Sequence, residues 1–321
     1  MTRFRKIVTH VRPHFDEVVA IWLLYVFGQE KFPGISQAEI EYWGFGKTPD
    51  GRSAEEYERE GVLLIGVGGG RFDEHPTATK ERTAGECAAT LVAKALGVRE
   101  RPELQQILNE VLSNDLNGGG SLFGVPAIIQ IFHHQYQENH EKAMDWAMMA
   151  VDAKYCEQRE FFHGTKQEFE QKAKVEILGW FYARSCERKP LKLVTIISDN
   201  EQIAKYARSE HGCYAAAVIQ QRTSGNVMIF ANKYYKPDFS LVASALRVRE
   251  RGLNGQLPAV FDELLDIVLR SEGKVAGAEE WFYHKGMEAL LNGSSTAPDV
   301  PPTKIKLSEI VAIVKTHAVF A

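Results

Sequence analysis

The sequence predicts an α/β fold with two domains, and three observations support this prediction. With 321 residues, the chain is longer than one typical domain and can bury two hydrophobic cores. Apolar runs at residues 4–8 and 62–65 are typical of short strands that are buried on both faces, as in parallel sheets. Apolar segments with helical character occur at residues 18–24 and 104–112. We therefore expect a parallel sheet flanked by helices in the first part of the chain, followed by a smaller α/β domain.

The expected domain boundaries follow changes in composition along the chain. Residues 1–130 contain the strands and helices of the first domain. Residues 131–188 are polar and rich in charge, and we interpret them as a helical connector that packs on that domain. A second domain is expected at residues 189–321, where new apolar runs begin. Its expected elements are strands at 191–197, 215–220 and 227–231, a hairpin turn at 223–226, and helices at 200–210, 239–251, 259–270 and 303–314.

Composition narrows the classes of function. The net charge of −4 gives no global basic field for duplex nucleic acid, although a local groove could still bind a short anionic strand. No apolar run approaches the ~20 residues that span a bilayer, and no signal-peptide core follows the basic N-terminus, so we expect a cytoplasmic protein without a membrane partner. The 4 cysteines have no C-x-x-C spacing, which argues against a thiolate zinc site or a disulfide framework. Whether the chain forms a homodimer stays open.

A metal site is indicated where the first predicted strand ends. His10, His14 and Asp16 lie close together in the segment that leads into the expected helix at residues 18–24. Imidazole nitrogens and an ionised carboxylate together suit manganese, zinc or iron, and a strand end leaves coordination positions open for water. The alternative interpretation is a helix-capping aspartate with two incidental histidines.

A second set of similar side chains follows the strand expected at residues 62–65. Asp73, Glu74 and His75 come after a glycine-rich turn, which lets the backbone approach a ligand or bend sharply. The glycines do not form a dinucleotide-binding fingerprint, because no helix with the required phasing begins there. A further acid, Asp115, lies near the end of the helix expected around 104–112, where an ordinary C-terminal turn is the alternative.

The order of these motifs resembles that of the DHH phosphoesterase superfamily. The first motif of that family is H-x-x-P-D-x-D, and residues 10–16 fit it with His14 in place of the first aspartate. This exchange resembles the DHH-like branch related to melanocyte proliferating gene proteins, which carry H-N-G-x-F-H-x-D-E. Further segments are similar to the D-V-G-G, R-[YF]-D-H-H, S-A-G and I-D-N-G motifs of the branch, namely residues 66–69, 71–75, 83–85 and 114–118.

The resemblance implies a divalent metal held by five side chains, His10, His14, Asp16, Glu74 and Asp115. Mn²⁺ is the metal it favours, with Mg²⁺, Zn²⁺ and Fe²⁺ as alternatives. Two positions depart from the family pattern, since the aspartate that bridges two metals is Gly66 here and the first histidine of D-H-H is Glu74. Glycine has no side chain, so it stays open whether one or two ions bind and whether the chain is catalytic.

The resemblance also implies roles in catalysis and substrate binding. Water would attack a phosphoryl group with the help of the metal, with Asp73 as an orienting group or base and His75 as a proton donor or phosphate contact. Arg71 could clamp phosphate oxygens, although an arginine in such a position is often a solvated surface charge. The second domain of the family contributes substrate contacts, and the candidates here are Arg222, His284 and Lys285.

Together these features predict a metal-dependent phosphohydrolase or phosphodiesterase. The expected substrate is a short single-stranded RNA or DNA or a nucleotide, and a 3′-to-5′ exonuclease is the most concrete version that the resemblance implies. One alternative is a phosphatase or pyrophosphatase that acts on a small molecule. The other is a non-catalytic metal- or nucleotide-binding protein, for which Gly66 and Glu74 are the argument.

Overall fold

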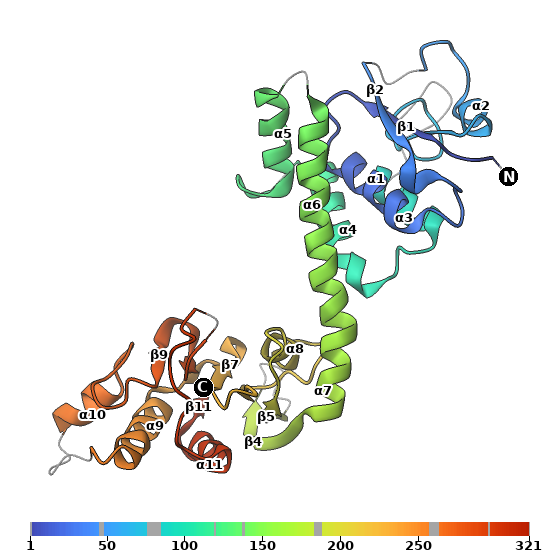
Figure 1. Cartoon of the computed structure of the whole chain (residues 1–321). Helices are drawn as coiled ribbons and strands as arrows, with labels where there is room; N and C mark the ends of the chain where they lie inside the picture. Colours follow the sequence, from blue (N-terminus) through green and yellow to red (C-terminus); the bar gives the residue numbers. More distant parts are fainter. Residues whose placement is uncertain are drawn as a thin grey trace. The chain divides into compact units, whose positions relative to one another are not determined.

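The chain divides into two units, residues 1–162 and residues 163–321, in the computed structural model shown in Figure 1. The structure describes the chain in eight ranges, which are 2–44, 48–75, 85–118, 120–136, 139–182, 188–256, 263–294 and 296–320. The fold is mixed α/β, with a parallel three-stranded sheet in the first unit and a mixed sheet with helices in the second. The α/β class predicted from the sequence is therefore confirmed.

The first unit is built on three parallel strands in the order β2-β1-β3. Their bounds are Lys6–His10 for β1, Glu39–Trp43 for β2 and Val62–Leu64 for β3. β1 is central because it pairs with both neighbours, and its Ile7 and Val8 side chains are fully buried on opposite faces. Parallel strands end at the same edge of a sheet, so the loops that follow β1 and β3 are brought together there.

One helix, α1, forms the centre of the first unit. It spans Phe15–Phe27, and its residues from 15 to 24 are all buried, because an apolar surface on every side of a helix is stable only in a core. Around it pack α3, α4, α5 and α6, which span Ala88–Leu96, Pro102–Asn117, Val125–Gln135 and His140–Arg159. The short helix α2, Ala54–Arg59, contacts β3, and the 3-10 turn η1 spans Ile35–Gln37.

The second unit has a six-stranded sheet in the order β4-β5-β6-β7-β10-β9. Only β5 and β6 pair in parallel, and the other neighbours are antiparallel. The strands span Lys174–Tyr182, Arg188–Ile197, Ala217–Gln221, Val227–Ala231, Phe282–His284 and Ala289–Leu291, numbered β4, β5, β6, β7, β9 and β10. The hairpin predicted between β6 and β7 is confirmed, and Gly225 adopts the positive φ of 91° in its turn.

Helices and short elements complete the second unit. The helices are α7 Lys166–Lys172, α8 Ile203–Arg208, α9 Ser240–Leu253, α10 Glu263–Leu269 and α11 Leu307–His317. The short turns are the π-helical η2 Glu160–Thr165 at the unit boundary, η3 Lys233–Tyr235 and η4 Lys285–Met287. A small sheet pairs β8 Pro237–Asp238 with β11 Val319–Phe320. The closing helix expected at 303–314 is present as α11, but it begins at Leu307 and ends at His317; its Ile310 and Val314 are fully buried. Residues 83–84 of the segment that is similar to S-A-G, and the first residues of the helix expected at 259–270, lie outside the described residues.

The interpretation of residues 131–188 as a helical connector needs correction. Residues 174–182 form strand β4 at the edge of the second sheet, and α6 contributes Met144, Ala147 and Val151 to the core of the first unit. The charged residues of this stretch hid the strand, because an edge strand exposes much of its surface: 46% of Val175 and 59% of Ile177 are exposed.

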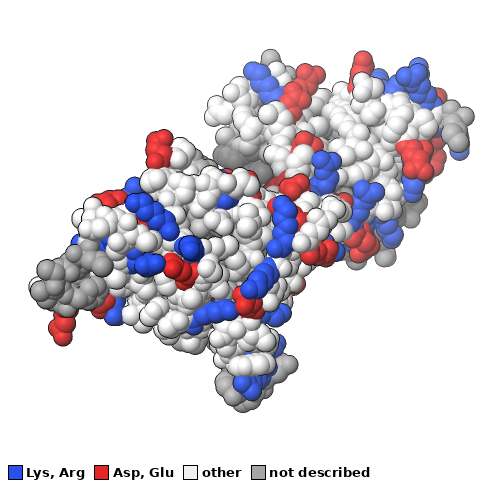
Figure 2. All heavy atoms as spheres, turned by 60° about the horizontal axis from the view of Figure 1, so that its bottom comes forward, with Lys and Arg blue, Asp and Glu red and all other residues white. Residues whose placement is uncertain are grey.

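Charged side chains of both signs are mixed on the face of the molecule shown in Figure 2. This face therefore presents no broad field of one sign. Surface ion pairs of the second unit include Arg249 with Glu309 at 3.0 Å and Lys315 with Glu176 at 2.8 Å. Among the described residues, no helix combines the length and the apolar character needed to cross a bilayer.

We predict that Arg247 is a main source of stability in the second unit. Its fully buried guanidinium donates hydrogen bonds to the carbonyl oxygens of Leu269 and Ser271, both at 2.8 Å, and to that of Gly273. Arg247→Met leaves these carbonyls unpaired, so we expect a loss of about 3–5 kcal/mol in the free energy of unfolding. The measurement is urea denaturation of the full chain, followed by intrinsic tryptophan fluorescence.

Arg249 on the same helix provides the matched control. It is exposed and pairs with Glu309 at the surface, so Arg249→Met is expected to cost less than about 1 kcal/mol. Equal losses for the two variants would show that the buried hydrogen bonds of Arg247 add no more to the free energy of unfolding than a surface ion pair does.

Candidate metal centre

The loop between β1 and α1 brings His10, His14 and Glu17 together. Their ligand atoms, one from each residue, all lie within 4.8 Å of one another. The backbone N–H of His14, just before the helix, donates a hydrogen bond to Glu17 Oε2 at 2.7 Å, which caps the first turn of α1. Arg12 in this loop has a φ of 57°, a left-handed conformation that is uncommon for a residue other than glycine.

Glu17 is the residue of this group that sequence reasoning missed. It is 1% exposed, and its Oε1 lies 3.1 Å from His10 Nε2. Burial opposes its ionisation, but the hydrogen bond and charge of His10 outweigh burial and lower the pKa of Glu17. The same contact raises the pKa of His10 against the effect of burial. A glutamate at the third position of a helix, after an extended residue, is a sequence signal that could have identified it.

The loop after β3 holds Asp73 through a set of hydrogen bonds. Asp73 Oδ2 accepts one from the backbone N–H of Gly69 at 2.8 Å, and Oδ1 accepts one from the backbone N–H of His75 at 3.1 Å. Oδ1 also lies 3.0 Å from His75 Nδ1. Asp73, Glu74 and His75 form a second group of potential ligands, in which His75 is exposed to solvent and the two acids are buried.

Three acids from different elements meet at the third group. Asp16 comes from α1, Glu74 from the loop after β3 and Asp115 from the last turn of α4, with ligand atoms within 4.8 Å of one another. Asp16 and Glu74 are 3% and 0% exposed. Among the residues that the structure describes, Asp16 Oδ2 and both carboxylate oxygens of Glu74 have no hydrogen-bond partner. His75 Nδ1 lies 3.4 Å from Glu74 Oε1.

The electrostatics of this third group disfavour ionised acids in the protein alone. Burial, together with the charges of Glu17, Glu74 and Asp115, raises the pKa of Asp16 well above its ordinary value. Burial and the charges of Glu17 and Asp115 also raise the pKa of Glu74. A divalent cation would offset this repulsion and bind the unpartnered oxygens, so the residues present fit a metal. Carboxylate and imidazole ligands in this number suit several divalent metals and do not select one.

Glu17 occupies the space in front of Gly66. Gly66 has a φ of 65°, and a Cβ atom added to it would lie 2.7 Å from Glu17 Oε1 and 2.9 Å from Glu17 Cγ. A side chain at position 66 would therefore point into the carboxylate of Glu17. The carboxylate of Glu17 therefore lies where a side chain at position 66 would be.

The candidate substrate-binding residues are divided between the two units. Arg71 pairs with Glu58, and its guanidinium lies 5.0 Å and 4.9 Å from the ring centres of Phe32 and Phe72. None of these three contact residues belongs to a ligand group. In the second unit, Arg222 Nη2 lies 3.4 Å from Glu201, His284 Nδ1 lies 3.6 Å from Glu272, and Lys285 is exposed.

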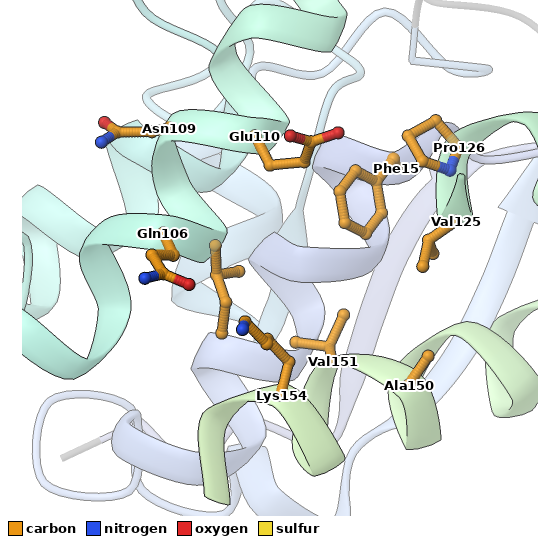
Figure 3. Close-up of a pocket in the computed structure, with 10 residues that line it drawn as sticks. Phe15, Gln106, Asn109, Glu110, Val125, Pro126, Ala150, Val151 and Lys154 are labelled. Carbon is orange, nitrogen blue, oxygen red and sulfur yellow. The ribbon is translucent and has the colours of Figure 1, made fainter. Parts of the chain in front are cut away.

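A cavity of about 560 Å³ opens between the helices of the first unit (Figure 3). Its lining residue from α1 is Phe15, which lies in sequence between His14 and Asp16. The other lining residues come from α4, α5 and α6 and are Gln106, Ile107, Asn109, Glu110, Val125, Pro126, Ala150, Val151 and Lys154. The cavity is mostly apolar with a few polar groups, which is typical of sites for small molecules.

Comparison with known proteins gives no match for this chain, either among family models or among curated proteins.

We predict that Gly66→Ala destabilises the protein by about 1–3 kcal/mol more than Gly97→Ala. Both glycines have positive φ, 65° and 75°, so both variants carry the backbone strain of an alanine in that region. The added Cβ meets Glu17 at position 66 and no atom within 4 Å at position 97. Urea denaturation of the two variants measures the difference, and equal losses would contradict the contact with Glu17.

We predict that Asp16→Asn stabilises the metal-free protein by about 1 kcal/mol at about pH 7.5, because it removes a buried charge. A raised pKa means that the folded state binds the proton more tightly than the unfolded state does. The penalty is therefore present above the folded-state pKa and is relieved as the pH falls through it. The advantage of the variant should shrink towards about pH 5, as measured by urea denaturation in EDTA.

The control for this experiment is Asp152→Asn, which neutralises an exposed acid on α6. Its stability should follow that of the wild type at both pH values. A pH-independent difference between Asp16→Asn and the wild type would contradict the raised pKa of Asp16.

Proposed function

We propose that this chain is a metal-dependent phosphohydrolase whose metal is held by Asp16, Glu74 and Asp115, together with His10, His14 and Glu17. The observation that carries the proposal is the set of buried carboxylate oxygens on Asp16 and Glu74 without hydrogen-bond partners in the described part of the chain. Buried acids of this kind are costly unless a cation compensates them. The order of motifs that resembles the DHH phosphoesterase superfamily supports the same reaction class.

A divalent metal, when bound, supplies Lewis acidity towards a phosphoryl oxygen and lowers the pKa of a coordinated water. Asp73 and His75, in the loop after β3, are suited to move a proton. Asp73 Oδ1 accepts a hydrogen bond from His75 Nδ1, which favours the tautomer with the proton on Nδ1 and leaves Nε2 for exchange with a substrate or leaving group. The backbone N–H of Gly69 donates a hydrogen bond to Asp73 Oδ2, which fixes the carboxylate. Asp73 can therefore position the ring of His75.

The departures at Gly66 and Glu74 are compatible with this function. Glu74 is an acid and can bind a metal through oxygen, and Glu17 places a carboxylate directly in front of Gly66. Acidic side chains are thus present at or in front of the two positions where the chain departs from the family motif. The alternative of a binding protein without catalysis predicts bound metal and no turnover.

The substrate is proposed as a short single-stranded nucleic acid or a nucleotide, cleaved from the 3′ end in the case of a strand. A second candidate is a small phosphorylated molecule, and the cavity bordered by Phe15 favours it. Its volume of about 560 Å³ is within the range of small-molecule sites. The mixed charges on the face in Figure 2 also give no track for a long strand there.

The test is metal analysis combined with hydrolysis assays in Mn²⁺. Bis-p-nitrophenyl phosphate and a short 5′-labelled RNA serve as substrates for the wild type, Asp16→Asn and Glu74→Gln. Both variants are expected to lose metal and to lose activity by on the order of 100-fold or more, because each removes a charged ligand oxygen.

Glu41→Gln is the matched control, since Glu41 is an exposed acid on β2 that pairs with Lys6 at 2.6 Å. It should retain metal and activity. Activity that survives in Asp16→Asn and Glu74→Gln would place catalysis elsewhere, and bound metal without turnover in the wild type would favour the binding protein.

A further inference from the structure

Among the buried polar atoms without a hydrogen-bond partner in the described residues, four lie in one part of the first unit outside the acidic groups. They are Thr9 Oγ1, Tyr42 OH, His133 Nδ1 and His140 Nδ1. Thr9 and His133 are 0% and 4% exposed as whole residues. Buried polar atoms in folded proteins are almost always paired, so several of them in one place indicate a ligand.

The four atoms belong to side chains that lie together. Thr9 and Tyr42 are register partners on β1 and β2, so their side chains share one face of the sheet. The rings of Tyr42 and His140 are 5.4 Å apart between centroids, and those of His133 and His140 are 5.7 Å apart. His133 is near the end of α5 and His140 begins α6, two helices that run side by side (Figure 1).

The hydrogen bond of His133 determines which of its nitrogens can bind a ligand. His133 Nε2 lies 2.9 Å from the carbonyl oxygen of Pro13, which can only accept, so Nε2 carries the proton. Nδ1 therefore presents a lone pair inside the protein. Histidines that bind metals are commonly held in this way, with one nitrogen on the metal and the other donating to a backbone carbonyl.

The surrounding groups keep both imidazoles neutral. Burial is the main cause that lowers the pKa of His133 and of His140, and the charge of Arg12 acts in the same direction on both. His14 also faces His133, while Glu141 and Asp145 lie near the hydroxyl of Tyr42. A metal ion would thus meet the lone pair of His133 Nδ1 and a second imidazole that carries no charge to repel it.

We propose that His133 Nδ1 and His140 Nδ1 bind one transition-metal ion of the Zn²⁺ type, at a site separate from the acidic groups of the candidate metal centre. Two imidazoles that share an ion through bonds of about 2.1 Å have ring centroids on the order of 5–6 Å apart, as these rings do. Water completes the coordination, and the hydroxyl groups of Thr9 and Tyr42 are available to it. Imidazole nitrogens suit zinc, copper or nickel, whereas the oxygen-rich third group suits harder ions.

The experiment uses the full chain with His10→Gln, Asp16→Asn and Glu74→Gln combined, so that each of the three ligand groups of the candidate metal centre loses a ligand. This protein is loaded with Zn²⁺, dialysed and analysed for zinc, and its melting temperature is measured with and without Zn²⁺. We expect about one zinc per chain and a higher melting temperature with zinc, because an ion that binds the folded state stabilises it. Adding His133→Gln or His140→Gln should abolish both effects.

His134 provides the matched control, because it is the adjacent histidine on α5 and is exposed. His134→Gln should retain the zinc and the shift in melting temperature. Far-ultraviolet circular dichroism checks that each variant is folded, and the glutamine at position 133 can still donate to Pro13. Zinc that remains in both His133→Gln and His140→Gln, or that is lost equally in His134→Gln, would overturn the proposal. So would the absence of zinc from the parent protein.

Discussion

The stability of the first unit is constrained by the mutual repulsion of the buried acids that gather near the carboxyl ends of β1 and β3. Asp16 is held there because α1 is apolar on every side and must be buried along its length. Glu17 is compensated by His10, whereas Asp16 and Glu74 have no comparable partner among the described residues. Keeping such acids buried without a cation costs stability.

The parts of the fold that sequence could predict are those that local physics determines. The long apolar helix α1 and the buried strands β1 and β3 carry their own periodicity, and the parallel pairing then requires that their loops meet. Strand ends of this kind indicate the two loops with His10, His14, Asp16 and Glu74, whereas the set of five ligands that includes Asp115 follows from the resemblance to the DHH superfamily. The structure brings them together in neighbouring groups of three, while their role as ligands remains a prediction.

The parts that sequence could not predict depend on contacts between distant residues. The position of Glu17 in front of Gly66 requires the exact relation of α1 to the loop after β3, and His133 meets Pro13 across a separation of 120 residues. The contacts of Arg71 with Glu58 and two aromatic rings also join residues that are distant in the sequence, and its role at a phosphate remains a prediction. Strand β4 was hidden because an edge strand lacks the continuous apolar pattern of a buried one.

Arg247 also couples the local unfolding of two segments of the second unit. Its guanidinium connects α9 to carbonyl groups of Leu269, Ser271 and Gly273, which span the end of α10 and the loop that follows. That loop has little regular secondary structure, yet it cannot detach without breaking charge-assisted hydrogen bonds inside the core. Amide hydrogens in the loop would therefore exchange with solvent together with those of α9, so that an irregular segment and a helix behave as one cooperative unit.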